Sequence, residues 1–97
     1  MKEVQENRLH LIIKGRVQGV GFRYYTYQIG MTLLLKGWVR NRFSGNVEVL
    51  AEGPKDRLNL LLREIRKGPP YSQVNDIDIT WSDPVGDLPA FTILETH

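Results

Sequence analysis

Two hydrophobic periodicities alternate along the chain, and their order constrains the fold more than any other feature. Apolar and polar residues alternate, as in half-buried strands, over residues 9–14, 47–51 and 77–81, and residues 37–40 form a further predicted strand. After Phe22 and after Pro54 the apolar residues instead recur every three or four positions, which predicts two helices. Phe91 and Ile93 indicate a short final strand. The order is therefore strand, helix, strand, strand, helix, strand, with a possible fifth strand.

This order of elements is typical of one architecture. We expect an α+β fold of the ferredoxin-like, split β-α-β type, in which two helices cover one face of an antiparallel sheet of four to five strands. The chain has 97 residues, enough for one domain with a modest core. We expect residues 1–7, which are polar, to form a disordered arm, and residues 8–97 to form the single domain.

The residues that are missing exclude several classes of protein. The chain has no cysteine and only two histidines, His10 and His97, so it offers no disulfide, no thiolate chemistry and no histidine-based metal site. No metal and no cofactor is expected. No apolar run approaches the roughly 18 residues that span a membrane. We therefore expect a soluble, cytoplasmic monomer with no membrane partner, in which both histidines are structural or solvated.

The charges are distributed unevenly. Residues 8–43 contain seven Lys and Arg residues and no acidic residue, whereas residues 44–97 contain five basic and nine acidic residues. The net charge of +2 therefore hides a strongly basic half. This asymmetry indicates an anionic partner, and we expect Arg16, Arg40 and Arg42 to add to a positive field.

A glycine-rich loop, Gly15 to Gly21, lies between the first predicted strand and the first predicted helix. Unpaired N–H groups at a helix N-terminus and in a glycine loop can converge on one anion. Arg23 falls in the first helical turn, and its planar guanidinium suits a phosphate. The spacing fits neither a Walker A loop nor the dinucleotide fingerprint. Taken alone, it leaves a phosphate cradle and an ordinary glycine turn equally open.

Two motifs together resemble the acylphosphatase family. The first runs from Gly15 to Arg23 (GRVQGVGFR) and the second from Gly37 to Asn41 (GWVRN), followed by a glycine turn and a third strand. The resemblance implies a ferredoxin-like fold. It also implies hydrolysis, without a metal, of the carboxyl-phosphate bond of small acyl phosphates to a carboxylate and inorganic phosphate.

The resemblance also implies roles for individual residues. Arg23 binds the phosphate and offsets its charge, and Asn41 orients the attacking water. Backbone N–H groups of the loop cradle the phosphate, from Val17, Gln18, Gly19, Val20, Gly21 and Phe22. The basic half offers no carboxylate to act as a base, and an amide cannot remove a proton. A phosphate oxygen of the substrate is therefore expected to take the proton of the water.

The sequence departs from the common pattern of that family at three positions. Gly30 stands where alanine is usual, Leu34 where a glycine often follows the first helix, and Ser44 where Asp often precedes the turn glycine. We expect Gly30 to cost about 1 kcal/mol relative to alanine. We expect the helix to end without a glycine cap in the left-handed conformation. All three bear on stability more than on chemistry.

Two other functions were weighed against hydrolysis. RNA-recognition modules share this order of elements, but their third strand exposes aromatic residues, where this chain has Glu48, Leu50 and Glu52. An anion-binding regulatory domain would not require the water-orienting amide of Asn41. We therefore expect no nucleic-acid partner. Tyr24 is expected to pack against other residues, with contact to the acyl group as the lesser alternative.

Overall fold

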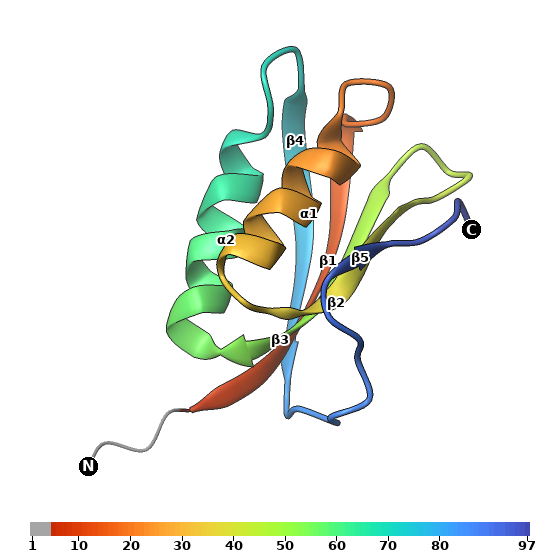
Figure 1. Ribbon diagram of the computed structural model, residues 1–97. Helices are drawn as coiled ribbons and strands as arrows, with labels where there is room; N and C mark the ends of the chain where they lie inside the picture. The colour runs from red at the N-terminus through yellow and green to blue at the C-terminus, as the bar shows by residue number, and fades with distance from the viewer. Residues whose placement is uncertain (1–4) are drawn as a thin grey trace.

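A five-stranded sheet carries both helices on one face in the computed structural model, which describes residues 5–97 (Figure 1). This arrangement confirms the predicted fold class. No helix in this part of the chain is long and apolar enough to cross a membrane. The elements in chain order are β1 (Glu6–Arg16), α1 (Phe22–Thr32), β2 (Lys36–Asn41), β3 (Val47–Pro54), α2 (Lys55–Lys67), β4 (Gln73–Ser82) and β5 (Thr92–Ile93).

The sheet has the strand order β4-β1-β3-β2-β5. β1 pairs antiparallel with β3 and β4, and β3 pairs antiparallel with β2. β5 instead runs parallel to β2, with Thr92 opposite Trp38 and Ile93 opposite Val39. The four longer strands are thus antiparallel as expected, and β5 adds a short parallel strand at one edge. The reason is the connection: the chain crosses from β4 at one edge to the opposite edge, where it enters beside β2 in the same direction (Figure 1).

The first strand begins earlier than expected. Glu6 and Asn7 pair with Pro54 and Gly53 at the end of β3, and the carbonyl oxygen of Gln5 accepts a hydrogen bond from the N–H of Lys55. The expected boundary of a disordered arm at residue 7 is therefore wrong, because β3 supplies backbone partners to these residues. Residues 1–4 of that arm lie outside the described part of the chain.

The core fills the space between the sheet and the two helices. Alternate residues of β1, which are Leu9, Leu11 and Ile13, are fully buried. The apolar stripe of α2 packs onto this face, as its spacing predicted. This stripe consists of Leu58, Leu61, Leu62 and Ile65. The remaining core residues come from α1, β2, β3 and the connecting segments. The core therefore lies against the central strands β1 and β3.

Gly30 is needed for close packing of Phe91 against α1. A Cβ atom on Gly30 would lie 2.5 Å from Cγ of Phe91, a separation that side chains do not tolerate. The Phe91 ring is only 3% exposed. Gly30 is thus expected to lower the stability of the helix, but it allows a specific contact with Phe91. This contact holds the chain against α1 just before β5.

The C-terminus of α1 has a left-handed cap without a glycine. Leu34 has a φ of 56° and its side chain is 77% exposed. Its N–H donates to the carbonyl oxygen of Met31, and the N–H of Leu35 donates to that of Gly30. These bonds form a Schellman motif, whose left-handed position usually carries glycine. The backbone therefore keeps the usual geometry of this motif, although leucine stands at the position where glycine is usual.

Candidate active site

The loop between β1 and α1 presents backbone N–H groups at the start of the helix. Gly19 and Gly21 have φ values of 74° and 80°, which favour glycine, although a Cβ atom at either position would meet no other atom within 4 Å. No side chain caps α1, and its first turn contains no acidic residue. The first N–H groups of α1 and the positive end of its dipole are therefore open to an anion.

A cleft of about 320 Å³ brings the two predicted catalytic residues together. Arg23 enters it from the first turn of α1, and Asn41 enters it from the last position of β2. The predicted phosphate-binding residues that line the same cleft are Val17, Gly19, Gly21 and Phe22. Arg23 and Asn41, 18 positions apart in the sequence, thus meet where the end of β2 reaches the first turn of α1.

Asn41 carries a buried acceptor that no described protein group satisfies. Its side-chain Oδ1 is buried and accepts no hydrogen bond from any described residue. Its backbone is held by pairing with Val47 on one side. On the other side the N–H of His97 donates to its carbonyl oxygen over 3.0 Å. A buried acceptor without a partner costs about 1–3 kcal/mol, so the described protein leaves a hydrogen-bonding capacity of Asn41 unused.

Two predicted phosphate-binding residues do not line the cleft. The side-chain Nε2 of Gln18 donates to the carbonyl oxygens of Arg42 and Asn46, at 2.7 and 2.9 Å. Val20 packs against the hydrophobic core. Their side chains therefore anchor the loop at its two sides. The prediction for these residues concerned their backbone N–H groups, and it stays a prediction.

Tyr24 and Ile93 line the cleft beside Arg23 and Asn41. Packing was the favoured interpretation for Tyr24, but its side chain is 58% exposed. The buried face of α1 is formed by Phe22, Thr26 and Gly30, and Tyr24 lies off this face, which the helical periodicity could have indicated. No local pattern could have placed Ile93 here, because its position depends on the pairing of β5 with β2.

The basic half of the chain is partly neutralised by ion pairs. Glu48 binds Arg40, Arg42 and His10, with N to O distances of 2.8, 3.2 and 2.7 Å. Arg8 pairs with both Glu52 and Asp87. The contribution expected from Arg40 and Arg42 to a positive field is therefore reduced, because both share the single carboxylate of Glu48.

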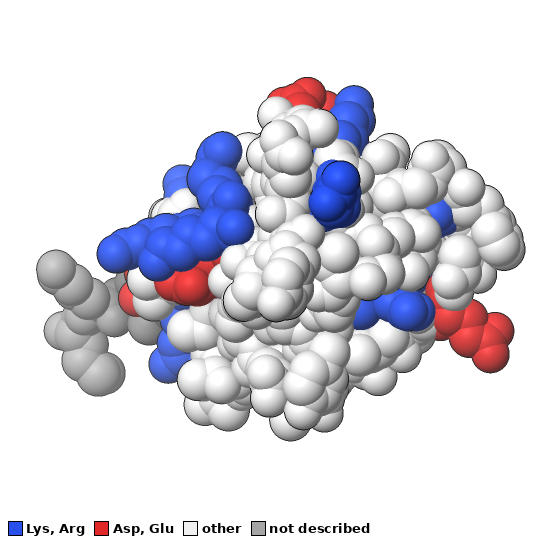
Figure 2. Space-filling model, turned by 90° about the horizontal axis from the view of Figure 1, so that it is seen from above, with Lys and Arg blue, Asp and Glu red and all other residues white. Residues whose placement is uncertain are grey.

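Three of the seven basic residues between positions 8 and 43 form no ion pair within the described chain, namely Arg16, Arg23 and Lys36. Figure 2 looks down on the end of the molecule that carries the loop between β1 and α1. Basic side chains lie at several places on this face, and acidic ones lie towards its margins. Among the described residues, Arg23 is the only charged side chain that lines the cleft.

The pKa values of the two central glutamates follow from these contacts. Burial would raise the pKa of Glu48, but hydrogen bonds from His10 and Arg40 outweigh burial and lower the pKa. Burial opposes the ionised form of Glu52 in the same way, and bonds from the N–H groups of Val85 and Gly86 and from Arg8 lower its pKa. Both carboxylates are therefore ionised and occupied, on the sheet away from the cleft lining.

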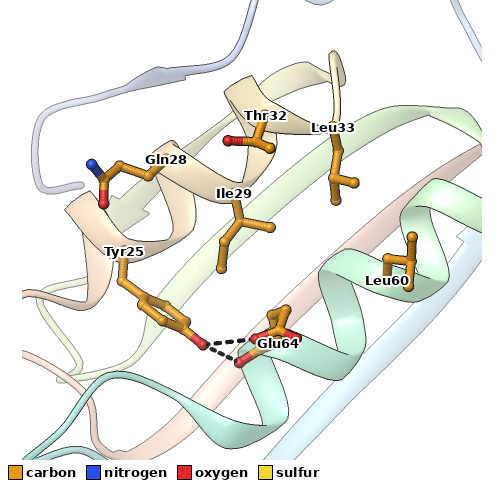
Figure 3. Close-up of a pocket in the computed structure, with 7 residues that line it drawn as sticks. All are labelled: Tyr25, Gln28, Ile29, Thr32, Leu33, Leu60 and Glu64. Carbon is orange, nitrogen blue, oxygen red and sulfur yellow. Dashed lines mark hydrogen bonds between the residues drawn. The ribbon is translucent and has the colours of Figure 1, made fainter.

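A larger hollow of about 560 Å³ lies elsewhere, between α1 and α2. Its lining is mostly apolar, and Tyr25 and Glu64 face each other across it (Figure 3). The Tyr25 hydroxyl donates to the carbonyl oxygen of Glu64 over 2.8 Å. Burial raises the pKa of Tyr25, and the Glu64 carboxylate adds to the increase. Neither Arg23 nor Asn41 reaches this hollow, so we place the candidate active site in the smaller cleft.

Comparisons with known proteins show which family the chain is similar to. A family model described as Acylphosphatase matches residues 9–93. The acylphosphatase of Koribacter versatilis is 45% identical over 93 residues, which cover 96% of this chain and 84% of that protein.

Solved structures give the same result. The crystal structure of acylphosphatase from Bacillus subtilis superposes with a TM-score of 0.87 at 41% identity, covering 91% of this chain and 98% of that one. The structure of an acylphosphatase from Coxiella burnetii has a TM-score of 0.86 at 31% identity, covering 97% of this chain and 100% of that one. Both sequence and fold are therefore shared over nearly the whole length.

Proposed function

This chain belongs to the acylphosphatase family, and from that premise we propose that its cleft hydrolyses small acyl phosphates to a carboxylate and inorganic phosphate. The observation that carries the proposal is the meeting of Arg23 with Asn41, whose Oδ1 has no partner among the described residues, in one cleft at the start of α1. One group binds an anion and the other accepts a hydrogen bond.

The phosphate group lies against the start of α1 in this proposal. Backbone N–H groups from residues 17–22 and the guanidinium of Arg23 bind its oxygens, which bear the negative charge of the transition state. The uncapped helix and the absence of an acid in its first turn support this role. Because the donors are held by the fold, little reorganisation accompanies the reaction.

Asn41 orients the attacking water. Its Oδ1 accepts a hydrogen bond from the water and so directs an oxygen lone pair towards phosphorus. The absence of a partner for this atom among the described residues supports the role. The leaving group needs no strong general acid, since a carboxylate has a conjugate acid with a pKa of about 4.

The water loses its proton to a phosphate oxygen of the substrate. The described residues that line the cleft include no Asp, Glu or His. Glu48 and Glu52, the two buried glutamates, are held in ion pairs on β3. A pH–rate profile governed by an enzyme carboxylate would contradict this step.

Phosphate release from benzoyl phosphate in the presence of EDTA tests the proposal. Arg23→Ala should lose both turnover and inhibition by inorganic phosphate. Asn41→Ala should lose turnover by a factor of roughly 100 or more while still binding phosphate, because only the water has lost its partner. An inactive parent protein would overturn the proposed activity, and a fully active Asn41→Ala variant would overturn the role of that residue.

Two exposed residues of α2 provide matched controls. Arg63 and Asn59 are exposed, and neither lines the cleft. Arg63→Ala and Asn59→Ala remove the same side-chain types and should leave turnover within twofold of the parent value.

We propose further that the protein has no nucleic-acid partner. Glu48 and Glu52 on β3 bind Arg8, Arg40 and Arg42, and this supports the proposal because these arginines are already occupied. The monomeric state and the cytoplasmic location stay predictions from the sequence, and sedimentation velocity would test the first of them.

A further inference from the structure

We propose that Tyr24 and Ile93 form a subsite for the acyl group, which selects acyl phosphates with an uncharged, planar, apolar acyl group. The inference rests on the proposed function. That function names the bond that is broken, and the inference adds which acyl groups the site prefers. Both side chains line the cleft that contains Arg23 and Asn41. Tyr24 is 58% and Ile93 is 38% exposed.

The cleft is larger than a phosphate group requires. Its volume is about 320 Å³. A phosphate group has five heavy atoms, and at about 30 Å³ for each water-sized atom it fills roughly half of that space. The remaining space is that of a small acyl group, so the residues that line it contact whatever is attached to the phosphate.

Tyr24 is held in place by its neighbours on α1. Its ring stacks on the ring of Tyr27, with centroids 6.1 Å apart and an angle of 28° between the planes. The side-chain Nε2 of Gln28 donates to its hydroxyl over 3.2 Å. A ring fixed in this way loses little conformational freedom when a ligand packs against it. Its free face can therefore stack on a planar acyl group.

The charges around the cleft disfavour an ionised acyl group. Arg23 is the only charged side chain that the described part of the chain contributes to the lining, and in the proposed function the phosphate binds it. Arg40 and Arg42 are bound to Glu48. A carboxylate on the acyl group would therefore lose water without gaining a partner. Ile93 offers only an apolar contact on its side of the cleft.

The experiment uses two phosphonates of equal charge, whose carbon–phosphorus bond separates binding from turnover. Calorimetric Kd values for phenylphosphonate and methylphosphonate give a preference ratio. We expect the parent protein to bind phenylphosphonate about fivefold more tightly, and Tyr24→Ala to reduce the ratio to below twofold. Tyr24→Phe, which keeps the ring, should retain the ratio. Ile93→Ala should lower it by about twofold.

Matched measurements keep the result specific. Met31 lies on the same helix two turns beyond Tyr24 and does not line the cleft, so Met31→Ala should keep the parent ratio. The Kd of inorganic phosphate should be unchanged in Tyr24→Ala. An unchanged phenyl preference in Tyr24→Ala, or an equal loss of affinity for both phosphonates, would overturn the inference.

Kinetics with benzoyl phosphate and acetyl phosphate separate this inference from the proposed function. A parent protein that hydrolyses both compounds with a ratio of kcat/KM values independent of Tyr24 refutes the subsite and leaves the hydrolase intact. A parent protein that hydrolyses neither, but whose phenyl preference depends on Tyr24, refutes the hydrolase and supports the subsite.

Discussion

The side-chain Nε2 of Gln18 donates a hydrogen bond to the carbonyl oxygen of Arg42 over 2.7 Å. The same nitrogen donates to the carbonyl oxygen of Asn46 over 2.9 Å. Arg42 follows Asn41 directly, and the N–H of Arg42 in turn donates to the carbonyl oxygen of Asn46. One amide therefore connects the phosphate loop to both ends of the β2–β3 turn, and it fixes the loop relative to the residue that orients water in the proposed mechanism.

Replacing Gln18 should reduce catalysis without removing any group that contacts substrate. Gln18→Leu keeps a similar side-chain size but loses both hydrogen bonds. We expect kcat/KM for benzoyl phosphate to fall about tenfold, equivalent to about 1.4 kcal/mol of transition-state stabilisation. Gln73→Leu, at the exposed start of β4, should leave kcat/KM within twofold. An equally small change in Gln18→Leu would contradict the positioning role.

Gly30→Ala should destabilise the protein although alanine is the better helix former. The new Cβ would lie 2.5 Å from the Phe91 ring, and overpacking of this kind costs about 1–3 kcal/mol. Helix propensity offsets about 1 kcal/mol of that cost. Urea denaturation should therefore show a net loss of up to about 2 kcal/mol in the free energy of unfolding.

A second variant distinguishes the clash from other effects of Gly30→Ala. Phe91→Leu removes the ring, so in that background the added methyl group should be tolerated or stabilising. The two substitutions are thus expected to be non-additive. If Gly30→Ala raised the free energy of unfolding of the parent protein, the packing argument would be wrong.

The elements that the sequence predicted are those with a local pattern. A buried face of a strand or helix has a local pattern in the sequence. Both the alternation in β1 (Leu9, Leu11 and Ile13) and the apolar stripe of α2 predicted such a face, and these residues are buried in the structure. The parallel pairing of β5 has no local pattern, because it depends on a crossover and on the contact between Gly30 and Phe91. Ile93 could not be predicted in the cleft for the same reason.

In the candidate site too, features with a local sequence pattern were predicted and features that depend on distant contacts were not. The family resemblance carried by the two motifs predicted Arg23 and Asn41, and the fold places both in one cleft. The side-chain role of Gln18 was missed, because its partners are carbonyl oxygens 24 and 28 positions away. The charge count also overstated the positive field, because ion pairs such as Arg40 with Glu48 join distant parts of the sequence.

Leu34→Gly should stabilise the protein. Leu34 has a φ of 56° and packs little, being 77% exposed. A left-handed conformation costs an L-residue about 1–2 kcal/mol, and the greater freedom of glycine in the unfolded chain offsets about 0.4–1 kcal/mol. The free energy of unfolding should rise by about 0.5–1 kcal/mol. Leu34→Ala keeps the strained backbone and should bring no increase, whereas a similar gain in both variants would refute the argument.

The Glu48 network should make stability depend on pH. His10, Arg40 and Arg42 contact its carboxylate, and the hydrogen bonds from His10 and Arg40 hold the pKa of Glu48 below its ordinary value despite burial, which opposes ionisation. Because the folded-state pKa is the lower one, the stabilisation is present above the unfolded value of about 4.3 and is lost as pH falls through the folded value.

Glu48→Gln should therefore lower the free energy of unfolding by about 1–3 kcal/mol at pH 7, and the difference from the parent protein should shrink as the pH falls below about 4. Urea denaturation at a series of pH values measures this convergence. Glu95→Gln, at an exposed position that forms no ion pair among the described residues, should follow the parent curve. A deficit in Glu48→Gln that stays constant across the pH range would show that the carboxylate contributes through packing and not through its charge.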